Sequence, residues 1–261
     1  VMRYQDDVPK IPAAAMSNPD ADLVDALLKR NPDALLELQM SPKNAGFNTS
    51  YNVIAEVTGS SKPNEIVLIG AHLDSWDEGT GAIDDGAGVA IVTAAAKHIQ
   101  DLLVKPARTV RVVLYAAEEI GLVGGKAYAE AHKAELPLHY IAAESDFGAG
   151  RIYQIDTKVN ESAFAEVQHA LSPMSFNGVA LGNNQASGGP DVSMLPALGV
   201  PVASLRQDGH DYFDYHHTPN DTLDKIDPAA LAQNVAAYAQ FAYIMANANT
   251  ALTPLATQSE K

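Results

Sequence analysis

The sequence predicts an α/β fold, namely a three-layer α/β/α domain with a mostly parallel, mixed central sheet. Segments with strand character alternate with segments with helical character from residue 51 onwards. Residues 66–70 and 110–114 are near-continuous apolar runs, which are typical of strands buried on both faces of a parallel sheet. The chain has 261 residues, of which 47% are hydrophobic, so it is long enough to bury one large core.

The individual strands and helices are predicted from the pattern of apolar residues and from the glycines, prolines and capping residues at their ends. The expected strands are residues 51–58, 65–71, 108–115, 138–143, 151–156 and 201–205. The expected helices are residues 88 to about 103, 123 to about 134, 161–171, and a long C-terminal helix from Pro228. Proline suits the first turn of this last helix, and Asp227 is placed to cap it.

The first 46 residues differ in composition from the rest of the chain. Prolines interrupt them around one helical stretch, residues 21–29, in which leucines recur at helical spacing and which Asn18 or Asp20 is placed to cap. We expect residues 1–46 to form a peripheral segment and residues 47–261 to form the main domain.

Composition excludes several classes of protein. The formal net charge of -15 argues against nucleic acid or an anionic membrane as a partner, because both would repel the chain. No apolar run is long enough to span a bilayer, and the start is not a signal peptide. Because Val1 is not an initiator methionine, we expect a processed product or an excised piece. There is no cysteine, so histidines and carboxylates must hold any zinc ion.

Polar residues follow the expected strand 65–71 at the point where it ends. His72 is the first, and Asp74 is placed to accept a hydrogen bond from its second ring nitrogen. Asp84 lies in a glycine-rich turn directly before a helix. Taken alone, His72 fits a structural histidine and Asp84 or Asp85 fits a helix cap.

Two adjacent carboxylates, Glu118 and Glu119, follow the next apolar strand. Adjacent carboxylates past a buried strand repel each other, and this repulsion is tolerable with a cation nearby or with one proton retained. The pair therefore indicates a functional site more strongly than a surface position.

Further candidates are Glu144 and Asp146 after the strand 138–143, and His216 and His217 in a polar loop before the last helix. Strand ends in an open α/β sheet converge on one crevice, so we expect these groups to meet there. Histidines and carboxylates without cysteine fit zinc or another divalent transition metal, with more than one ion possible.

Five motifs then carry a family resemblance, in order, over residues 66–225. They are Ala-His-Leu-Asp-Ser at 71–75, Ile-Asp-Asp-Gly-Ala-Gly at 83–88, Ala-Ala-Glu-Glu-Ile-Gly at 116–121, Glu-Ser-Asp at 144–146, and His-Thr-Pro-Asn-Asp-Thr at 217–222. The chain resembles the co-catalytic di-zinc aminopeptidase and glutamate carboxypeptidase family. The resemblance implies a zinc-exopeptidase-like fold and two Zn²⁺ ions per chain.

The resemblance also assigns metal ligands. It implies one bridging carboxylate and one flanking pair for each ion: Asp84 as the bridge, His72 with Asp146, and Glu119 with His217. Glu144 competes with Asp146, and the 27-residue spacing from Glu119 resembles the family pattern better for Asp146. His217 is preferred over His216 because the His-Thr-x-x-Asp-Thr context matches from it.

The implied activity is hydrolysis of short peptides or dipeptides by a metal-bridging hydroxide, with Glu118 as the general base. Asp74 and Asp221 would orient the histidine ligands. The resemblance further implies a cis peptide bond between Asp84 and Asp85.

The residues that would bind the substrate are less clearly indicated by the sequence than the metal ligands. Arg206 is a candidate partner for a substrate carboxylate, although a surface arginine is the alternative. Gly189, in the loop 186–191, and Tyr215, in an aromatic cluster with Tyr212 and Phe213, are candidates to line the pocket. Aminopeptidase, dipeptidase and carboxypeptidase activities all stay open.

Two other functional classes are the alternatives. One is a glutaminyl-cyclase-like acyltransferase, which has this fold and one zinc ion. The other is a catalytically inert fragment or binding protein. The resemblance also implies that residues 1–46 are the tail of a protease-associated insert, that a homodimer is possible, and that the protein is secreted or periplasmic.

Overall fold

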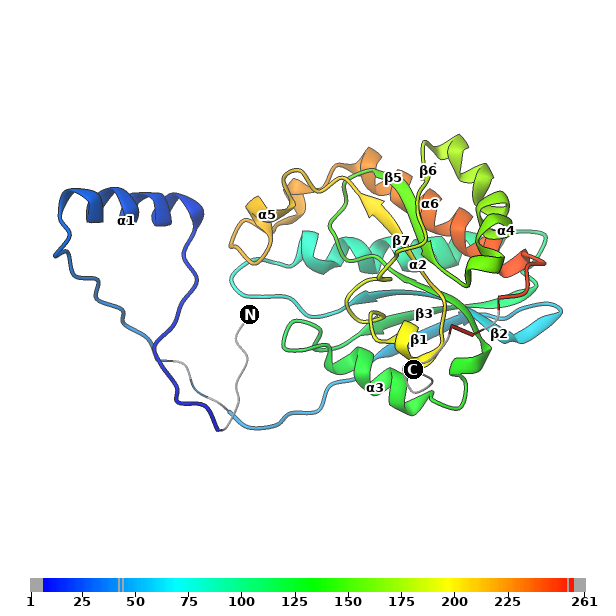
Figure 1. Ribbon diagram of the computed structural model, residues 1–261, viewed down its shortest axis with the longest axis horizontal. Coiled ribbons are helices and arrows are strands. Elements are labelled where there is room, and N and C mark those ends of the chain that lie inside the picture. Colours follow the sequence, from blue (N-terminus) through cyan, green and yellow to red (C-terminus); the bar gives the residue numbers. More distant parts are fainter. Residues whose placement is uncertain (1–6, 42, 44, 253, 256–261) are drawn as a thin grey trace. The chain divides into compact units, whose positions relative to one another are not determined.

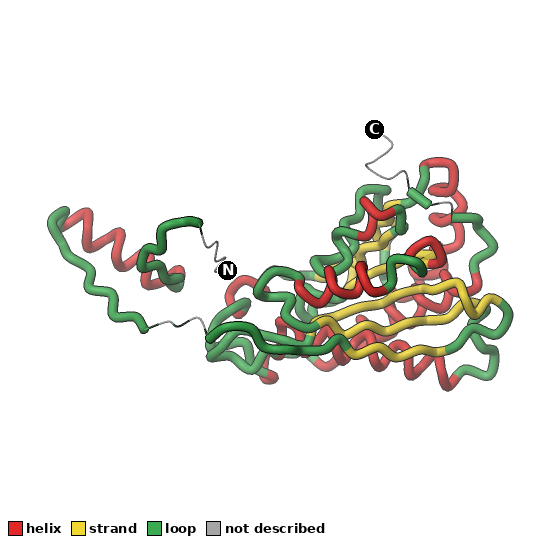
Figure 2. Tube along the Cα trace, turned by 90° about the horizontal axis from the view of Figure 1, so that it is seen from below, coloured by secondary structure: helices red, strands yellow, loops and turns green. Residues whose placement is uncertain are grey.

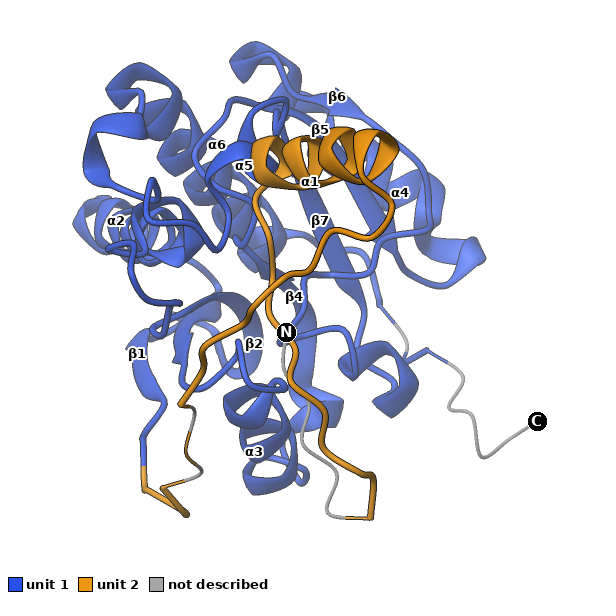
Figure 3. Cartoon of the chain, turned by 90° about the vertical axis from the view of Figure 1, so that its left-hand side faces the viewer, with its two compact units in different colours: residues 1, 50–261 blue, residues 2–49 orange. Residues whose placement is uncertain are grey.

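A computed structural model describes residues 7–41, 43, 45–252 and 254–255. The chain divides into two compact units, residues 2–49 and residues 50–261 (Figure 3). The first unit contains α1 (Asn18–Arg30), none of whose residues is buried. Its cap is the hydroxyl of Ser17, which accepts the backbone N–H of Asp20 at 3.2 Å, in place of the expected Asn18 or Asp20 side chains.

The second unit is built on a seven-stranded sheet in the order β1-β3-β2-β4-β7-β5-β6 (Figure 1). The strands are β1 (Val53–Val57), β2 (Lys62–His72), β3 (Arg108–Tyr115), β4 (His139–Glu144), β5 (Ile152–Lys158), β6 (Ala180–Leu181) and β7 (Val202–Gln207). β1 pairs antiparallel with β3, and β5 pairs antiparallel with β7. The other neighbours are parallel, so the mostly parallel, mixed sheet is confirmed.

Helices cover both faces of this sheet. The helices α2 (Ala87–Asp101), α4 (Glu161–Leu171) and α6 (Pro228–Asn247) lie on one face, and α3 (Val123–Ala131) lies on the other (Figures 1 and 2). Alternation along β2 separates two cores: Val67 and Ile69 belong to the core of α2 and α6, whereas Ile66 and Leu68 belong to that of α3. The three-layer architecture follows from this double burial.

Element boundaries differ from expectation at two strands that matter for the site. β2 begins at Lys62 and includes His72, and β7 extends to Gln207, so Arg206 lies within a strand. α6 begins at Pro228 as expected, because Asp227 accepts the backbone N–H groups of Ala229 and Ala230 at 2.7 and 2.8 Å.

Several short elements were not expected from the sequence. They are η1 (Ala82–Gly86), η2 (Leu136–Leu138), η3 (Ser172–Asn177), η4 (Leu195–Leu198), α5 (Tyr212–Tyr215), η5 (Leu223–Lys225) and the strand β6. Among the described residues, no helix is both long enough and apolar enough to cross a bilayer.

Candidate metal centre

The predicted ligands come from the ends of three neighbouring parallel strands. His72 is the last residue of β2, Glu118 and Glu119 follow β3, and Asp146 follows β4. Because β2 pairs with both β3 and β4 in the same direction, their carboxyl ends meet at one edge of the sheet.

Asp84 lies at the centre of this edge and is almost fully buried. Its Oδ1 atom is 3.0 Å from Nε2 of His72. Its Oδ2 atom is 3.2 Å from Nε2 of His217 and 3.3 Å from Nε2 of His216. The two oxygens of one carboxylate therefore face two separate sets of nitrogen donors.

The first set groups His72 with Asp146, whose Oδ1 atom is 3.4 Å from Nε2 of His72. Glu144, the competing candidate, is directed elsewhere: its Oε2 atom accepts the backbone N–H of Asp191 at 2.8 Å. It belongs to none of the metal-capable groups found among the described residues, so the geometry favours Asp146 over Glu144.

The second set groups His217 with Glu119, where Nε2 of His217 lies 3.0 Å from Oε2. The rings of His216 and His217 stack with centroids 3.5 Å apart, which brings both to Asp84. Within the described part of the chain, only His217 of the two also approaches Glu119. The geometry thus favours His217, and His216 forms one group of possible ligands with His217 and Asp84.

Two acidic residues hold the backbone around these ligands. The carboxylate of Asp74 accepts the backbone N–H groups of Glu118 and Glu119 at 2.9 and 3.2 Å. Nδ1 of His72 is 2.8 Å from the backbone oxygen of Asp74 and 3.7 Å from its carboxylate. Asp74 therefore reaches His72 mainly through its backbone, while its side chain positions the glutamate turn.

Asp221 has different partners from those expected. Its two carboxylate oxygens accept the backbone N–H groups of Ile83 and Asp84 at 2.6 and 3.1 Å. We expected this carboxylate to orient a histidine. In the described part of the chain its hydrogen bonds go instead to the turn that carries Asp84. The peptide bond between Asp84 and Asp85 is cis, as the resemblance implies.

Asp85 joins the end of β2 to the start of α2. Its Oδ2 atom accepts the backbone N–H of His72 at 3.0 Å, and its Oδ1 atom accepts that of Gly88 at 3.1 Å. The contact with Gly88, in the first turn of α2, is the helix cap that the sequence predicts for Asp84 or Asp85. Asp85 is therefore a support for the ligand strand and for the helix beneath it.

Carboxylates outnumber cationic side chains at this edge of the sheet. Burial and mutual repulsion raise the pKa values of two of them, Glu118 and Glu119. Burial, followed by the negative charge of Asp146, raises the pKa of Glu118 to about 7. Burial, followed by the charge of Asp84, raises the pKa of Glu119 to about 8. Burial lowers the pKa of His72, but the surrounding carboxylates outweigh burial and raise it overall. A divalent cation would relieve this repulsion.

Unpartnered atoms also fit a cation. Among the described residues, Oε1 of Glu119 is buried without a hydrogen-bond partner. Nε2 of His217 lies 3.0 and 3.2 Å from carboxylate oxygens of Glu119 and Asp84, but neither contact has the geometry of a hydrogen bond. The donor atoms are imidazole nitrogens and carboxylate oxygens, which zinc accepts in tetrahedral and open sites. The residues present therefore fit zinc.

Trp76 contacts this centre and was given no role in the sequence analysis. Its Nε1–H donates to Oε2 of Glu119 at 2.8 Å, and its ring centroid is 5.8 Å from that of His217. The available signal was its position in His-Leu-Asp-Ser-Trp-Asp, four residues after His72, in a loop that leaves a strand end.

Two cavities are lined by predicted ligands or by their sequence neighbours. The larger, of about 420 Å³, is lined by Asp146, Gly189 and Arg206 among others, so it holds two of the three expected substrate residues. The third, Tyr215, does not line either cavity; its ring faces Nζ of Lys225 at 5.8 Å. The neighbouring Tyr212 lines the smaller cavity instead.

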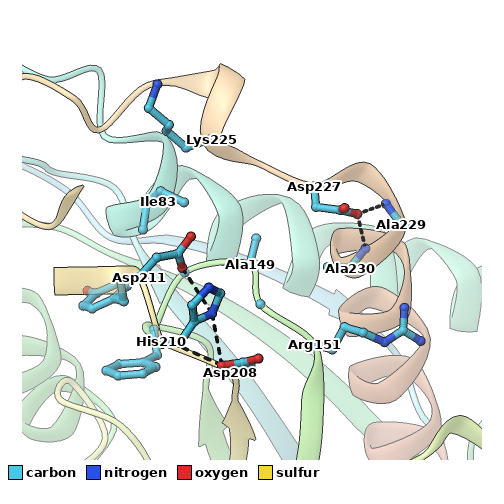
Figure 4. Close-up of a pocket in the computed structure, with 14 residues that line it drawn as sticks. Ile83, Ala149, Arg151, Asp208, His210, Asp211, Lys225, Asp227, Ala229 and Ala230 are labelled. Atoms are coloured by element: carbon cyan, nitrogen blue, oxygen red, sulfur yellow. Dashed lines mark hydrogen bonds and ion pairs between the residues drawn. The ribbon is translucent and has the colours of Figure 1, made fainter. Parts of the chain in front are cut away.

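The smaller cavity, of about 290 Å³, lies beside the N-terminal turn of α6 (Figure 4). Nδ1 of His210 lies 3.4 Å from Asp208 and 3.8 Å from Asp211, and Arg151 lines the same cavity. No predicted metal ligand is among its lining residues, which the structure describes in full. The cavity next to Asp146 is therefore the one continuous with the metal centre.

Comparisons with known proteins agree with this geometry. Residues 52–242 match Peptidase family M28. Mouse carboxypeptidase Q is 37% identical over 250 residues, which cover 95% of this chain and 52% of that protein. The crystal structure of a Peptidase M28 precursor from Shewanella amazonensis SB2B has 69% identity and a TM-score of 0.93, covering 98% of this chain and 58% of that one.

A zinc aminopeptidase from Bacillus subtilis shares the fold, with a TM-score of 0.57 at 21% identity over 72% of this chain and 48% of that one. This chain spans about half the length of the curated relatives it matches. The match over residues 52–242 contains every predicted metal ligand. The chain belongs to Peptidase family M28.

Proposed function

We propose that residues 50–261 form the catalytic domain of a zinc-dependent exopeptidase that hydrolyses short peptides. The observation that carries the proposal is the position of Asp84, whose Oδ1 atom faces His72 and whose Oδ2 atom faces His217. A carboxylate that divides its oxygens between two donor sets suits two ions. The names of the relatives, a carboxypeptidase and a zinc aminopeptidase, support the same class of reaction.

His72 and Asp146 would hold one zinc ion, Glu119 and His217 would hold the other, and Asp84 would bridge them. When bound, two such ions lower the pKa of a water molecule and polarise the scissile carbonyl. The chain's own residues then keep their orientation through backbone contacts, since Asp74 fixes the glutamate turn and Asp221 fixes the turn of Asp84.

Glu118 is the proposed general base. It is half-buried beside the ligands, and its carboxylate has no hydrogen-bond partner among the described residues that would compete for a proton. Burial and the neighbouring carboxylates raise its pKa to about 7 in the zinc-free protein, and its carboxylate is the group proposed to take a proton from water and return it to the leaving amine. Glu119, one residue on, is committed to Trp76 and His217.

The test is metal stoichiometry together with turnover. The protein, loaded with zinc and freed of excess metal, is expected to contain two zinc ions per chain by atomic emission. It is expected to hydrolyse members of a dipeptide panel, and a chelator is expected to abolish this hydrolysis, with zinc restoring it.

Two results would contradict the proposal. One zinc ion per chain together with cyclisation of an N-terminal glutamine peptide would assign a glutaminyl-cyclase-like reaction. Bound zinc without hydrolysis of any dipeptide, N-blocked peptide or C-amidated peptide would assign a binding protein.

A further inference from the structure

The carboxylate of Asp146 has little direct support from the protein. Among the described residues, it accepts no hydrogen bond from a backbone N–H, and its ion-pair partner is Nε2 of His72 at 3.4 Å. Glu119 differs, because its Oε2 atom accepts the indole N–H of Trp76. The direction of the Asp146 carboxylate therefore depends on where the loop 145–151, between β4 and β5, places its backbone.

The start of this loop is fixed by Tyr238 of α6. The side chain of Tyr238 is buried, and its hydroxyl donates to the backbone oxygen of Glu144, the last residue of β4, at 2.6 Å. The next residue, Ser145, donates its backbone N–H to the backbone oxygen of Gly70 on β2 at 2.9 Å. The chain therefore enters the loop in a fixed direction directly before Asp146.

The end of the loop is fixed by two side-chain amides. Nε2 of Gln207, at the end of β7, donates to the backbone oxygen of Gly148 at 2.7 Å. Nδ2 of Asn234, on α6, donates to that of Gly150 at 2.8 Å. The two amides are also joined, because Nε2 of Gln207 donates to Oδ1 of Asn234 at 2.9 Å. Both side chains are buried, so water cannot easily replace a hydrogen bond that is lost here.

One face of α6 makes contacts on both sides of Asp146. Asn234 and Tyr238 are four residues apart, a spacing that places two side chains on the same face of a helix. Between them the loop is closely packed, since a Cβ atom at Gly150 would lie 1.8 Å from the backbone oxygen of Asp208. The helix is therefore a support that holds the loop before and after the proposed ligand.

Resting on the proposed function, we propose that Gln207, Asn234 and Tyr238 are positioning residues for one of the two zinc ions. They hold the backbone on both sides of Asp146, and in this way they direct its carboxylate toward the ion that it shares with His72. None of the three contacts the ion. Each acts through the loop.

The second set of ligands has its support elsewhere. Trp76, in the loop after β2, donates to Glu119, and the ring of His217 stacks on that of His216. In the part of the chain that the structure describes, the hydrogen bonds of the three positioning residues reach neither of these ligands. The two zinc sites therefore depend on different parts of the fold, and loss of the contacts from α6 and β7 should weaken one site alone.

The experiment measures each zinc site by itself. Glu119→Gln removes a ligand of the second set and leaves the site that contains Asp146. Asp146→Asn removes a ligand of the first set and leaves the site that contains Glu119. Competition against a chromophoric chelator gives the zinc affinity of each single-site variant, and the positioning residues are then replaced in both.

Tyr238→Phe is expected to lower the zinc affinity of the Glu119→Gln variant roughly 3- to 10-fold, the change that loss of one hydrogen bond commonly gives. Gln207→Met keeps the length of the side chain but removes two hydrogen bonds, so a loss of roughly 10- to 100-fold is expected. In the Asp146→Asn variant, both substitutions should leave the affinity within about twofold, because a site without that ligand does not depend on the loop.

Two matched controls remove similar groups from α6 without touching the loop. Tyr243→Phe removes a hydroxyl that contacts the backbone oxygen of Val104 at 3.2 Å. Gln240→Met removes an amide that donates to the backbone oxygen of Pro173 at 2.9 Å. Both controls are expected to leave the affinity of either site unchanged. Circular dichroism of the zinc-free proteins checks the fold, and Tyr238→Phe, which removes a single hydroxyl, keeps the test available where Gln207→Met does not fold.

The failures are distinguishable. Equal losses of affinity at both sites, or no loss at the site of Asp146, would overturn the positioning role and leave the proposed function standing. Absence of zinc from both single-site variants would contradict the ligand sets of the proposed function. Titration of Tyr238→Phe with all ligands present would then decide the inference: weaker binding of one of two zinc ions supports it, and weaker binding of both or of neither overturns it.

Discussion

The indole Nε1–H of Trp76 donates to Oε2 of Glu119 at 2.8 Å. The other carboxylate oxygen, Oε1, is buried without a partner among the described residues. One carboxylate oxygen of Glu119 thus accepts a hydrogen bond from the protein, and the other is without a hydrogen-bond partner among the described residues. The contact joins the loop after β2 to the turn after β3, so a single hydrogen bond orients a proposed ligand between two strand ends.

Replacing Trp76 with Phe should lower zinc affinity by roughly 10-fold or more, because partners that orient metal ligands commonly contribute this much. Competition against a chromophoric chelator measures the affinity, and circular dichroism checks the fold. Tyr243→Phe on α6, which removes a hydroxyl contact with the backbone oxygen of Val104 in the loop after α2, is the control. Unchanged affinity in Trp76→Phe would show that Glu119 needs no support from the indole.

Replacing Glu118 with Gln should reduce kcat by about 10²- to 10⁴-fold, the usual contribution of a general base, and should leave two zinc ions per chain. Glu119→Gln is the matched comparison on the adjacent residue and should lose zinc as well as activity. Dipeptide hydrolysis and metal analysis on the same samples separate the two effects. Loss of zinc in Glu118→Gln would reassign this residue to the metal sites.

Stability of the zinc-free protein should fall as pH rises. The pKa of Glu118 is raised from 4.5 to about 7 and that of Glu119 from 4.5 to about 8, so the folded state binds more protons than the unfolded state between these limits. With more protons bound in the folded state, the free energy of unfolding decreases with pH over this window, from about pH 4.5 to pH 8. Thermal melts across this range measure the slope.

Zinc should reverse this trend, because the ions bind the deprotonated carboxylates of the folded state. Adding zinc at pH 8 is therefore expected to raise Tm more than adding it at pH 5. The Glu119→Gln variant should show a flatter slope without metal. A zinc-free Tm that rises steadily from pH 5 to pH 8 would contradict the assigned direction of these pKa values.

Replacing Asp221 with Ala should destabilise the protein by about 2 kcal/mol and reduce zinc content, since it leaves two buried backbone N–H groups without their acceptor. Asp224→Ala, which removes an exposed carboxylate nearby in sequence, is the control and should be close to neutral. Chemical denaturation and metal analysis measure both. A full complement of zinc in Asp221→Ala would show that the turn of Asp84 is held by its neighbours alone.

The alternation of strands and helices could be predicted from the amino-acid pattern alone, and so could the strand ends that carry polar groups. Apolar runs such as residues 66–70 can be buried on both faces only inside a sheet, and residues directly after such runs must emerge at its edge. For this reason His72, the pair Glu118 and Glu119, and the pair Glu144 and Asp146 were expected at one edge of the sheet. The family resemblance then selected Glu119 and Asp146 as the predicted ligands.

The hydrogen-bond partners of these polar groups depend on how distant segments of the chain pack together. Asp221 and Ile83 are 138 residues apart and Trp76 and Glu119 are 43 apart, so no local pattern pairs them. The sequence also did not decide that Tyr212, rather than Tyr215 of the same aromatic cluster, lines one of the two cavities. Nor did it decide that Arg206, in the longer strand β7, lines the other. A local pattern predicts on which face, or at which end, of a strand or helix a residue lies. The loops that pack against that residue determine which atoms its side chain contacts.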